Sequence, residues 1–194
     1  MDLRTLKQEA KQAMKDNYGM ALIISILPPL LLGATGITGI ALILLAPVTV
    51  GMMWAFVMIN RRQTADLGVL LRGFSADGYL NNVIVLFLKN LFIFLWALLL
   101  IIPGIVKAYA YAMTPYLLAD DTVTNKADAI TQSRAMMQGH KGRLFMLHLS
   151  FIGWFILSFL TFGIAYFFYV RPYMMSADAR FYESLKAAYT GTTR

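Results

Sequence analysis

The stretch that decides the fold class is VIVLFLKNLFIFLWALLLIIPGIVKAYAYAMTPYLLA, residues 83–119. As one helix it would be roughly 55 Å long, against a bilayer hydrocarbon core of about 30 Å, so it must turn within itself. Its only adjacent pair of helix breakers is Pro103-Gly104, which predicts two helices, about 84–102 and about 105–118, joined by a tight turn. Because the second helix is short, a re-entrant hairpin stays open beside a full crossing.

The composition of the whole chain points to the same environment. Of 194 residues, 59% are hydrophobic and 14% are charged, and the mean hydropathy is +0.63. A soluble domain is roughly half apolar and about a quarter charged, so in water this chain would expose too much apolar surface. We therefore predict that a lipid bilayer covers it. The absence of cysteine excludes disulfides, thiolate catalysis and cysteine-ligated zinc.

Two more apolar regions flank the quoted stretch. Residues 18–60 hold two uncharged runs, separated by the glycines Gly33, Gly36 and Gly39. Residues 144–175 are again too long for one crossing, and Thr161-Phe162-Gly163 is the expected turn. The chain therefore contains three predicted apolar hairpins.

The predicted fold class is all-α: a polytopic transmembrane helical bundle of about six membrane helices in three hairpins, with an amphipathic N-terminal helix. We expect a single integral membrane domain, residues 1–194. Its parts in chain order are a basic amphipathic helix (1–17), the first hairpin (18–60), a cytoplasmic loop (61–82), the second hairpin (83–119), a cytoplasmic helix (120–143), the third hairpin (144–183) and a tail (184–194).

The N-terminal helix has two stripes. Leu3, Leu6, Ala10 and Ala13 recur at helical spacing beside Arg4, Lys7, Lys11 and Lys15. Such a helix suits an anionic membrane surface, and a solvated stub before the first span is the alternative. A cleaved signal peptide is disfavoured by the mixed charge of the lead-in and by Pro28-Pro29 in the apolar run.

The distribution of lysine and arginine predicts the orientation. The turns near 33–38, 103–104 and 161–163 contain none of the 17 basic residues. By the positive-inside rule, both termini and the segments 60–82 and 120–143 are cytoplasmic. The net charge of +7 is scattered between apolar runs, which favours anionic lipid headgroups as partners over nucleic acid. A protein partner or a homo-oligomer is also open.

The second and third hairpins share a series of positions. One carries Trp96, Gly104-Ile105, Pro115-Tyr116 and Asp120, and the other carries Trp154, Gly163-Ile164, Pro172-Tyr173 and Asp178. These positions predict an internal repeat with the same orientation across the bilayer, bent at each proline. Composition shared by all membrane hairpins is the alternative explanation.

Several motifs together resemble a known family. They are WALLLIIPGIVKAYAYAM at 96–113, AITQSRAMMQGHKGRLF at 129–145, LSFIGW at 149–154, LTFGI at 160–164, Pro172-Tyr173 and Phe181-Tyr182. The chain resembles the bacterial membrane family called domain of unknown function 975. The resemblance implies a polytopic protein of the bacterial cytoplasmic membrane, and it supplies no substrate, cofactor or catalytic residue.

No enzymatic motif appears in the sequence. His140 and His148 are eight residues apart without an acidic cluster, so we expect a packed or hydrogen-bonded His148 rather than a metal ligand. No GxSxG sequence and no glycine-rich phosphate loop is present. We therefore expect no enzyme, no cofactor and no bound metal.

Charged side chains within the apolar runs are the better candidates for a site. Each costs about 2.5–3.5 kcal/mol at mid-membrane, so such residues tend to face a partner or a cavity. The candidate intramembrane polar site comprises Lys107, Arg171, Asp178, Tyr166, Tyr169 and Tyr173. Lys107 follows the outer turn and could extend outward, whereas Arg171 is near mid-span and Asp178 is two helical turns away on the same face. An interhelical ion pair and a polar pocket for a solute or lipid headgroup are the two interpretations.

Two functions follow from this pattern. The first is a non-enzymatic multi-pass membrane protein that organises lipid or a protein partner through its basic cytoplasmic face. The alternative is a transporter or channel component for a small solute or lipid, with a polar path near Arg171. Transporters usually show more polar interruptions near the midplane, so we prefer the first.

Overall fold

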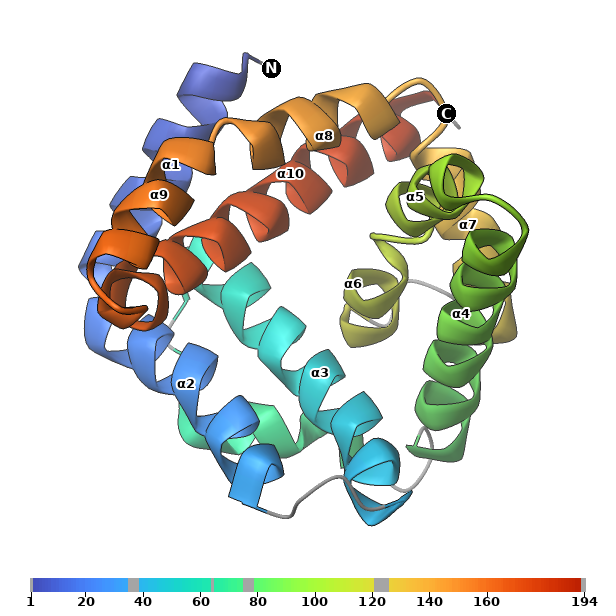
Figure 1. Ribbon diagram of the computed structural model, residues 1–194, viewed down its shortest axis with the longest axis horizontal. Helices are drawn as coiled ribbons and strands as arrows, with labels where there is room; N and C mark the ends of the chain where they lie inside the picture. Colours follow the sequence, from blue (N-terminus) through green and yellow to red (C-terminus); the bar gives the residue numbers. More distant parts are fainter. Residues whose placement is uncertain (1, 35–38, 64, 75–78, 121–125, 193–194) are drawn as a thin grey trace.

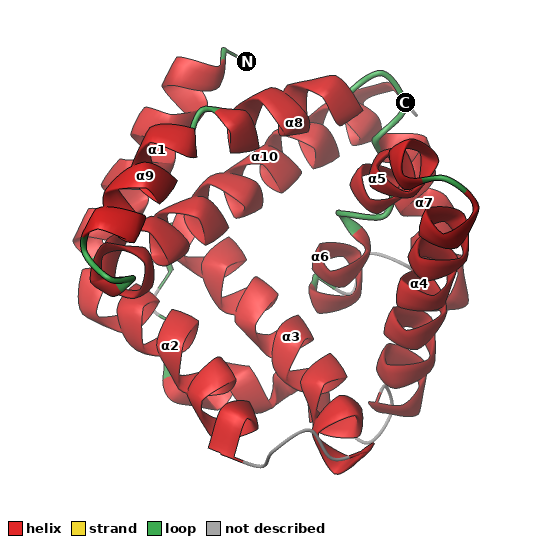
Figure 2. Cartoon of the chain, in the orientation of Figure 1, coloured by secondary structure: helices red, strands yellow, loops and turns green. Residues whose placement is uncertain are grey.

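The computed structural model describes residues 2–34, 39–63, 65–74, 79–120 and 126–192. Every regular element in these ranges is a helix, which confirms the all-α class (Figure 2). In chain order the elements are α1 (Leu3–Asp16), α2 (Tyr18–Ala34), α3 (Gly39–Asn60), the 3₁₀ helix η1 (Leu67–Phe74), α4 (Tyr79–Leu99), α5 (Ile101–Ala110), α6 (Thr114–Ala119), the 3₁₀ helix η2 (Lys126–Asp128), α7 (Ala129–Met136), α8 (Lys141–Leu149), α9 (Ile152–Leu160), the π-helix η3 (Tyr166–Val170) and α10 (Arg171–Thr192).

Helix α3 is the centre of the packing. It contacts α1, α2, α4, α6 and α10, and it crosses the middle of the body in Figure 1. Its second half is almost entirely apolar and places Ala55, Phe56, Val57 and Ile59 in the core with no exposed surface. The predicted turn between α2 and α3 at Gly36 lies outside the described residues.

The predicted N-terminal helix is confirmed as α1, but protein covers its apolar stripe. Leu6, Ala10, Ala13 and Met14 are buried, and α1 packs chiefly on α10. Ser176 on α10 donates a hydrogen bond of 2.9 Å to the backbone carbonyl of Ala10. The apolar face is therefore used inside the fold. Of the basic stripe, Arg4 and Lys15 are exposed, whereas Lys7 donates a hydrogen bond to the Ser150 hydroxyl.

The segment predicted as a cytoplasmic loop, 61–82, contains structure and runs back along α3. Leu70 lies against Gly51 and Gly73 lies against Pro47, so η1 is antiparallel to α3. A Cβ on Gly73 would be 2.0 Å from the carbonyl oxygen of Pro47, and only glycine permits this approach. Pro47 is roughly 20 Å along the helix from Asn60, so the segment does not stay beyond the end of α3.

The second hairpin turns earlier than predicted. Helix α4 ends at Leu99, and Leu100 is extended with φ −157° and ψ 134°. Pro103 lies in the first turn of α5, where its missing N–H breaks no helical hydrogen bond. A Cβ on Gly104 would be 2.6 Å from the Cα of Ala97, so glycine allows the two helices to touch.

The returning part of that hairpin is not the single helix that we predicted for 105–118. Helix α5 has ten residues, about 15 Å, which is half of a hydrocarbon core. After a turn, α6 runs into the protein, and all six of its residues are buried. Tyr116 stacks on Tyr182 of α10 with ring centroids 5.4 Å apart.

The third hairpin has its turn where the sequence predicts it. Phe162 and Gly163 have φ values of 50° and 83°, a left-handed conformation that glycine adopts without strain. The returning chain is helical from Ile164, through η3, to the end of α10 at Thr192. The region predicted as a tail, 184–194, is therefore helical as far as Thr192.

Two helical stretches are long and apolar enough to cross a membrane, Tyr79–Leu98 and Lys141–Leu160, the second formed by α8 and α9 together. Shorter apolar stretches occur in α2 and α3, at Tyr18–Leu30 and Ala46–Asn60. In Figure 1, α4 runs up the right side whereas α8 and α9 run across the top toward the left, so these helices are not parallel. A bundle of six crossing helices stays a prediction.

Candidate functional site

The predicted pair of Arg171 and Asp178 does not form. Asp178 accepts a hydrogen bond of 2.9 Å from Nε2 of His148 on α8, and Arg171 makes no ion pair with it. Seven residues of helix separate the two by about 10 Å along the axis, and His148 on the neighbouring helix is closer. The pairing prediction is therefore wrong, and the expected hydrogen-bonded His148 is confirmed.

The predicted tyrosine stripe packs against α9 and the turn before it. Tyr169 contacts Trp154 and Tyr173 contacts Phe151, each with ring centroids 5.0 Å apart. The Tyr173 hydroxyl donates to the backbone carbonyl of Lys7 at 3.2 Å. These are aromatic packing contacts rather than groups that line an open path.

His148 also connects to the second hairpin. Its Nδ1 lies 3.3 Å from the hydroxyl of Tyr109 on α5, on the opposite side of the ring from Asp178. His148 thus joins α5, α8 and α10 in one chain of polar contacts. Among the residues that the structure describes, no three histidine, aspartate or glutamate side chains gather as a metal site.

A buried aspartate outside the predicted site forms the largest polar cluster among the described residues. Asp120, at the end of α6, has a side chain that is 4% exposed. It accepts hydrogen bonds from Arg61 at 3.0 Å and from Tyr182 at 2.9 Å, and it forms an ion pair with Lys186. Arg61 also binds Glu183 at 2.9 Å. This cluster joins the ends of α3 and α6 to α10.

The charges in this cluster balance one another. Burial of Arg61 opposes its charge, but its contacts with Glu183 and Asp120 outweigh burial and raise its pKa. Two cations face two carboxylates, and Tyr182 supplies a further donor to Asp120. The cluster is therefore a satisfied structural network. The one sequence signal for it was an acidic residue directly after a long apolar run.

Lys107 lies in a different place from the rest of the predicted group. It lines a cavity of about 330 Å³ with Arg134 of α7 and Lys141 of α8. These two residues belong to the segment 120–143, which we expected on the opposite side of the membrane from the turn that precedes Lys107. Helix α5 is too short to separate Lys107 from that segment, and the outward extension of Lys107 stays a prediction.

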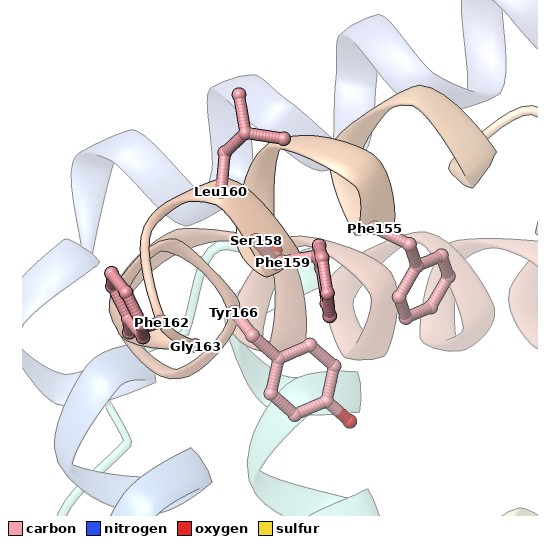
Figure 3. Close-up of a pocket in the computed structure, with 7 residues that line it drawn as sticks. All are labelled: Phe155, Ser158, Phe159, Leu160, Phe162, Gly163 and Tyr166. Atoms are coloured by element: carbon pink, nitrogen blue, oxygen red, sulfur yellow. The ribbon is translucent and has the colours of Figure 1, made fainter.

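An apolar cavity lies at the turn of the third hairpin. It has a volume of about 620 Å³ and is lined by Phe155, Ser158, Phe159, Leu160, Phe162, Gly163 and Tyr166. Figure 3 shows the rings of Phe155, Phe159 and Tyr166 along it, with Phe162 at the turn. Phe159 is 86% exposed and Phe162 is 98% exposed. The Ser158 hydroxyl donates its hydrogen bond to the backbone carbonyl of Trp154. The cavity therefore suits an apolar group.

Comparison with known proteins adds a family and no activity. No curated protein and no solved structure matches the chain. Residues 98–189 match the family model described as "Protein of unknown function (DUF975)". The match includes the two prolines and both hairpin glycines of the sequence motifs. Over this region the chain matches the DUF975 family, as the motifs predicted.

Proposed function

We propose that the chain is a non-enzymatic, multi-pass protein of the bacterial cytoplasmic membrane that organises anionic lipid or a protein partner at its basic side. The observation that supports this most directly is the exposure of apolar side chains on α4 and α9, which belong to the two long apolar stretches. On α4, Leu80, Phe87 and Phe94 are each more than 60% exposed. On α9, Ile156 is 60% exposed, Leu160 68% and Phe159 86%.

Such surfaces are costly in water and favourable in lipid. Each Å² of apolar surface that stays in water forgoes about 25 cal/mol of the free energy gained by burial. A contiguous exposed apolar patch therefore marks an interaction surface. By contrast, helix α6 is packed inside the protein, and all six of its residues are buried. Lipid acyl chains are therefore the proposed neighbours of α4 and α9.

Cysteine scanning tests lipid contact directly, because the chain has no native cysteine. Nitroxide labels at Phe87→Cys and Phe159→Cys, in vesicles, should be quenched by oxygen and not by a water-soluble nickel complex. Labels at Arg62→Cys and Asp128→Cys, both on exposed polar positions, serve as matched controls and should show the reverse. Nickel access at Phe87 and Phe159 would overturn the proposal.

Orientation needs a separate test. Both termini are proposed to be cytoplasmic, with the turn 161–163 on the outer side. An impermeant thiol reagent on intact cells should label Phe162→Cys, and it should label Gln63→Cys and Gln138→Cys only after lysis. Labelling of Gln63→Cys without lysis would reverse the orientation and leave the lipid-contact result intact.

Transport of a small solute or lipid stays the alternative proposal. A polar path near Arg171 would use Asp178 and the tyrosines, but Asp178 is bonded to His148, and Tyr169 and Tyr173 pack on Trp154 and Phe151. We therefore prefer the first function.

A further inference from the structure

We infer that the cavity between α5, α7 and α8 binds the phosphate of an anionic phospholipid headgroup. This inference rests on the proposed membrane location and names the site by which the basic side holds lipid. Lys107, Arg134 and Lys141 line the cavity, together with Thr131 and Gln138. Three cations and two neutral polar side chains, with no carboxylate among the lining residues, match the charge of a phosphate.

The three cations differ from other basic residues of the protein. Arg61, Lys186 and Arg180 each form an ion pair with a carboxylate. Within the described ranges, neither Lys107 nor Arg134 nor Lys141 has a carboxylate within salt-bridge distance. Their mutual repulsion is therefore not offset by the protein, and an anion would offset it.

The cavity is built on a fixed framework. Ser133 on α7 is fully buried and donates a hydrogen bond of 3.0 Å to the carbonyl of Ala110 at the end of α5. Residues 131, 134, 135 and 138 follow one face of the chain through α7 and the turn after it. The ammonium of Lys107 lies 4.5 Å from the ring centroid of Trp96. These contacts hold two of the cations beside the cavity before any ligand arrives.

The surroundings of the cavity favour a lipid over a free anion. Val106 adjoins Lys107 and is 45% exposed, and Phe145 is one turn after Lys141 and is 46% exposed. Exposed α4 packs along α5 and contributes Trp96. An amphiphile could thus place its phosphate among the cations and its acyl chains on the adjoining apolar surface. Inorganic phosphate would use only the first part.

The test measures phosphatidylglycerol retained by the purified protein, counted by native mass spectrometry after exchange into phosphatidylcholine nanodiscs with and without phosphatidylglycerol. The test variant is Lys107→Gln with Arg134→Gln and Lys141→Gln. The matched control is Arg4→Gln with Lys11→Gln and Lys15→Gln, which removes the same charge from the outward face of α1. We expect about fivefold weaker retention for each cavity cation removed, and almost no change in the control.

Each outcome has one meaning. Equal loss in the two triple variants would show general charge attraction and would overturn the site. Saturation of the cavity by inorganic phosphate at the same affinity as by phosphatidylglycerol would assign it to a soluble anion and overturn the lipid ligand. The single variants Lys107→Gln, Arg134→Gln and Lys141→Gln keep the test valid if the triple variant does not fold.

The oxygen and nickel accessibility at Phe87 and Phe159 separates this inference from the proposed function. Lipid contact there together with unchanged phosphatidylglycerol retention in the cavity variants would overturn the site alone. Water access at both positions would overturn the membrane location on which the site depends.

Discussion

The second and third hairpins begin alike and end differently. Each has a tryptophan in its first helix, a glycine at or just after the turn, a Pro-Tyr step on the return and an aspartate beyond it. In the second hairpin the returning helix stops at Ala110, and α6 bends into the core. In the third, the return is helical from Ile164 to Thr192. Similar positions of tryptophan, glycine, proline and aspartate therefore occur with two different backbone conformations.

Proline alone does not explain the difference. Pro115 and Pro172 are both the second residue of a helix, α6 and α10. Before Pro172, the π-helix η3 widens the turn and keeps the chain helical where proline supplies no donor. Before Pro115, the chain breaks at 111–113 instead. Local sequence permits both solutions, and residues after both prolines are buried, so contacts with other helices select between them.

The two aspartates show what makes that selection. Asp120 is bound by Arg61 and by groups of α10, all distant in sequence. Asp178 is bound by His148, which belongs to the helix pair leading into its own hairpin. The first contact draws α6 inward, and the second holds the hairpin together. The two hairpins also differ in direction in Figure 1, so the predicted repeat with one orientation is not seen.

The largest expected effect on stability comes from replacing the two aspartates. Asp120→Leu removes the carboxylate partner of Lys186 and Tyr182 and leaves Arg61 with Glu183 alone, so it should lower the free energy of unfolding by about 3–5 kcal/mol. Asp178→Leu loses a partly exposed pair and should cost about 1 kcal/mol. Unfolding in detergent, followed by circular dichroism, measures both. Equal losses would mean that Asp120 is not the stronger anchor.

A smaller effect is expected at the glycines of the two hairpins. Gly104→Ala forces a Cβ against the Cα of Ala97, so it should cost about 1–3 kcal/mol by overpacking. Gly153→Ala in α9 meets nothing within 4 Å and should be neutral or stabilise by up to about 1 kcal/mol. The same unfolding measurement applies. A neutral Gly104→Ala would show that α4 and α5 separate without cost.

The smallest effect separates the predicted ion pair from the observed one. His148→Leu removes the partner of Asp178 and should cost about 1 kcal/mol, whereas Arg171→Leu should change stability by less than about 0.5 kcal/mol. The double-mutant cycle with Asp178→Leu should show coupling for His148 alone. Coupling between Arg171 and Asp178 would restore the pair expected from the sequence.

Several features were predictable from the sequence because they depend on local chemistry. Helical periodicity predicted α1, the long apolar runs predicted α4 and the pair α8 and α9, and Gly163 predicted the turn of the third hairpin. The family motifs were also recognisable, because each is a short contiguous stretch of sequence. The segment 61–82 is not only a loop, because it contains η1. Polar residues and glycines such as Gly68 and Gly73 indicate a loop, whereas Gly73 serves close packing on α3.

The sequence alone determined that this protein is helical and rich in apolar surface, because composition and periodicity act over one or two turns of chain. Only the tertiary structure decided which charges meet. Asp120 bonds to Arg61, which is 59 residues away in the sequence. Lys107 lines a cavity with Arg134 and Lys141, because α5 is short and Ser133 of α7 bonds to the end of α5. The sequence gives the charge of a side chain, but its ion-pair partner depends on where the helices end and how they pack.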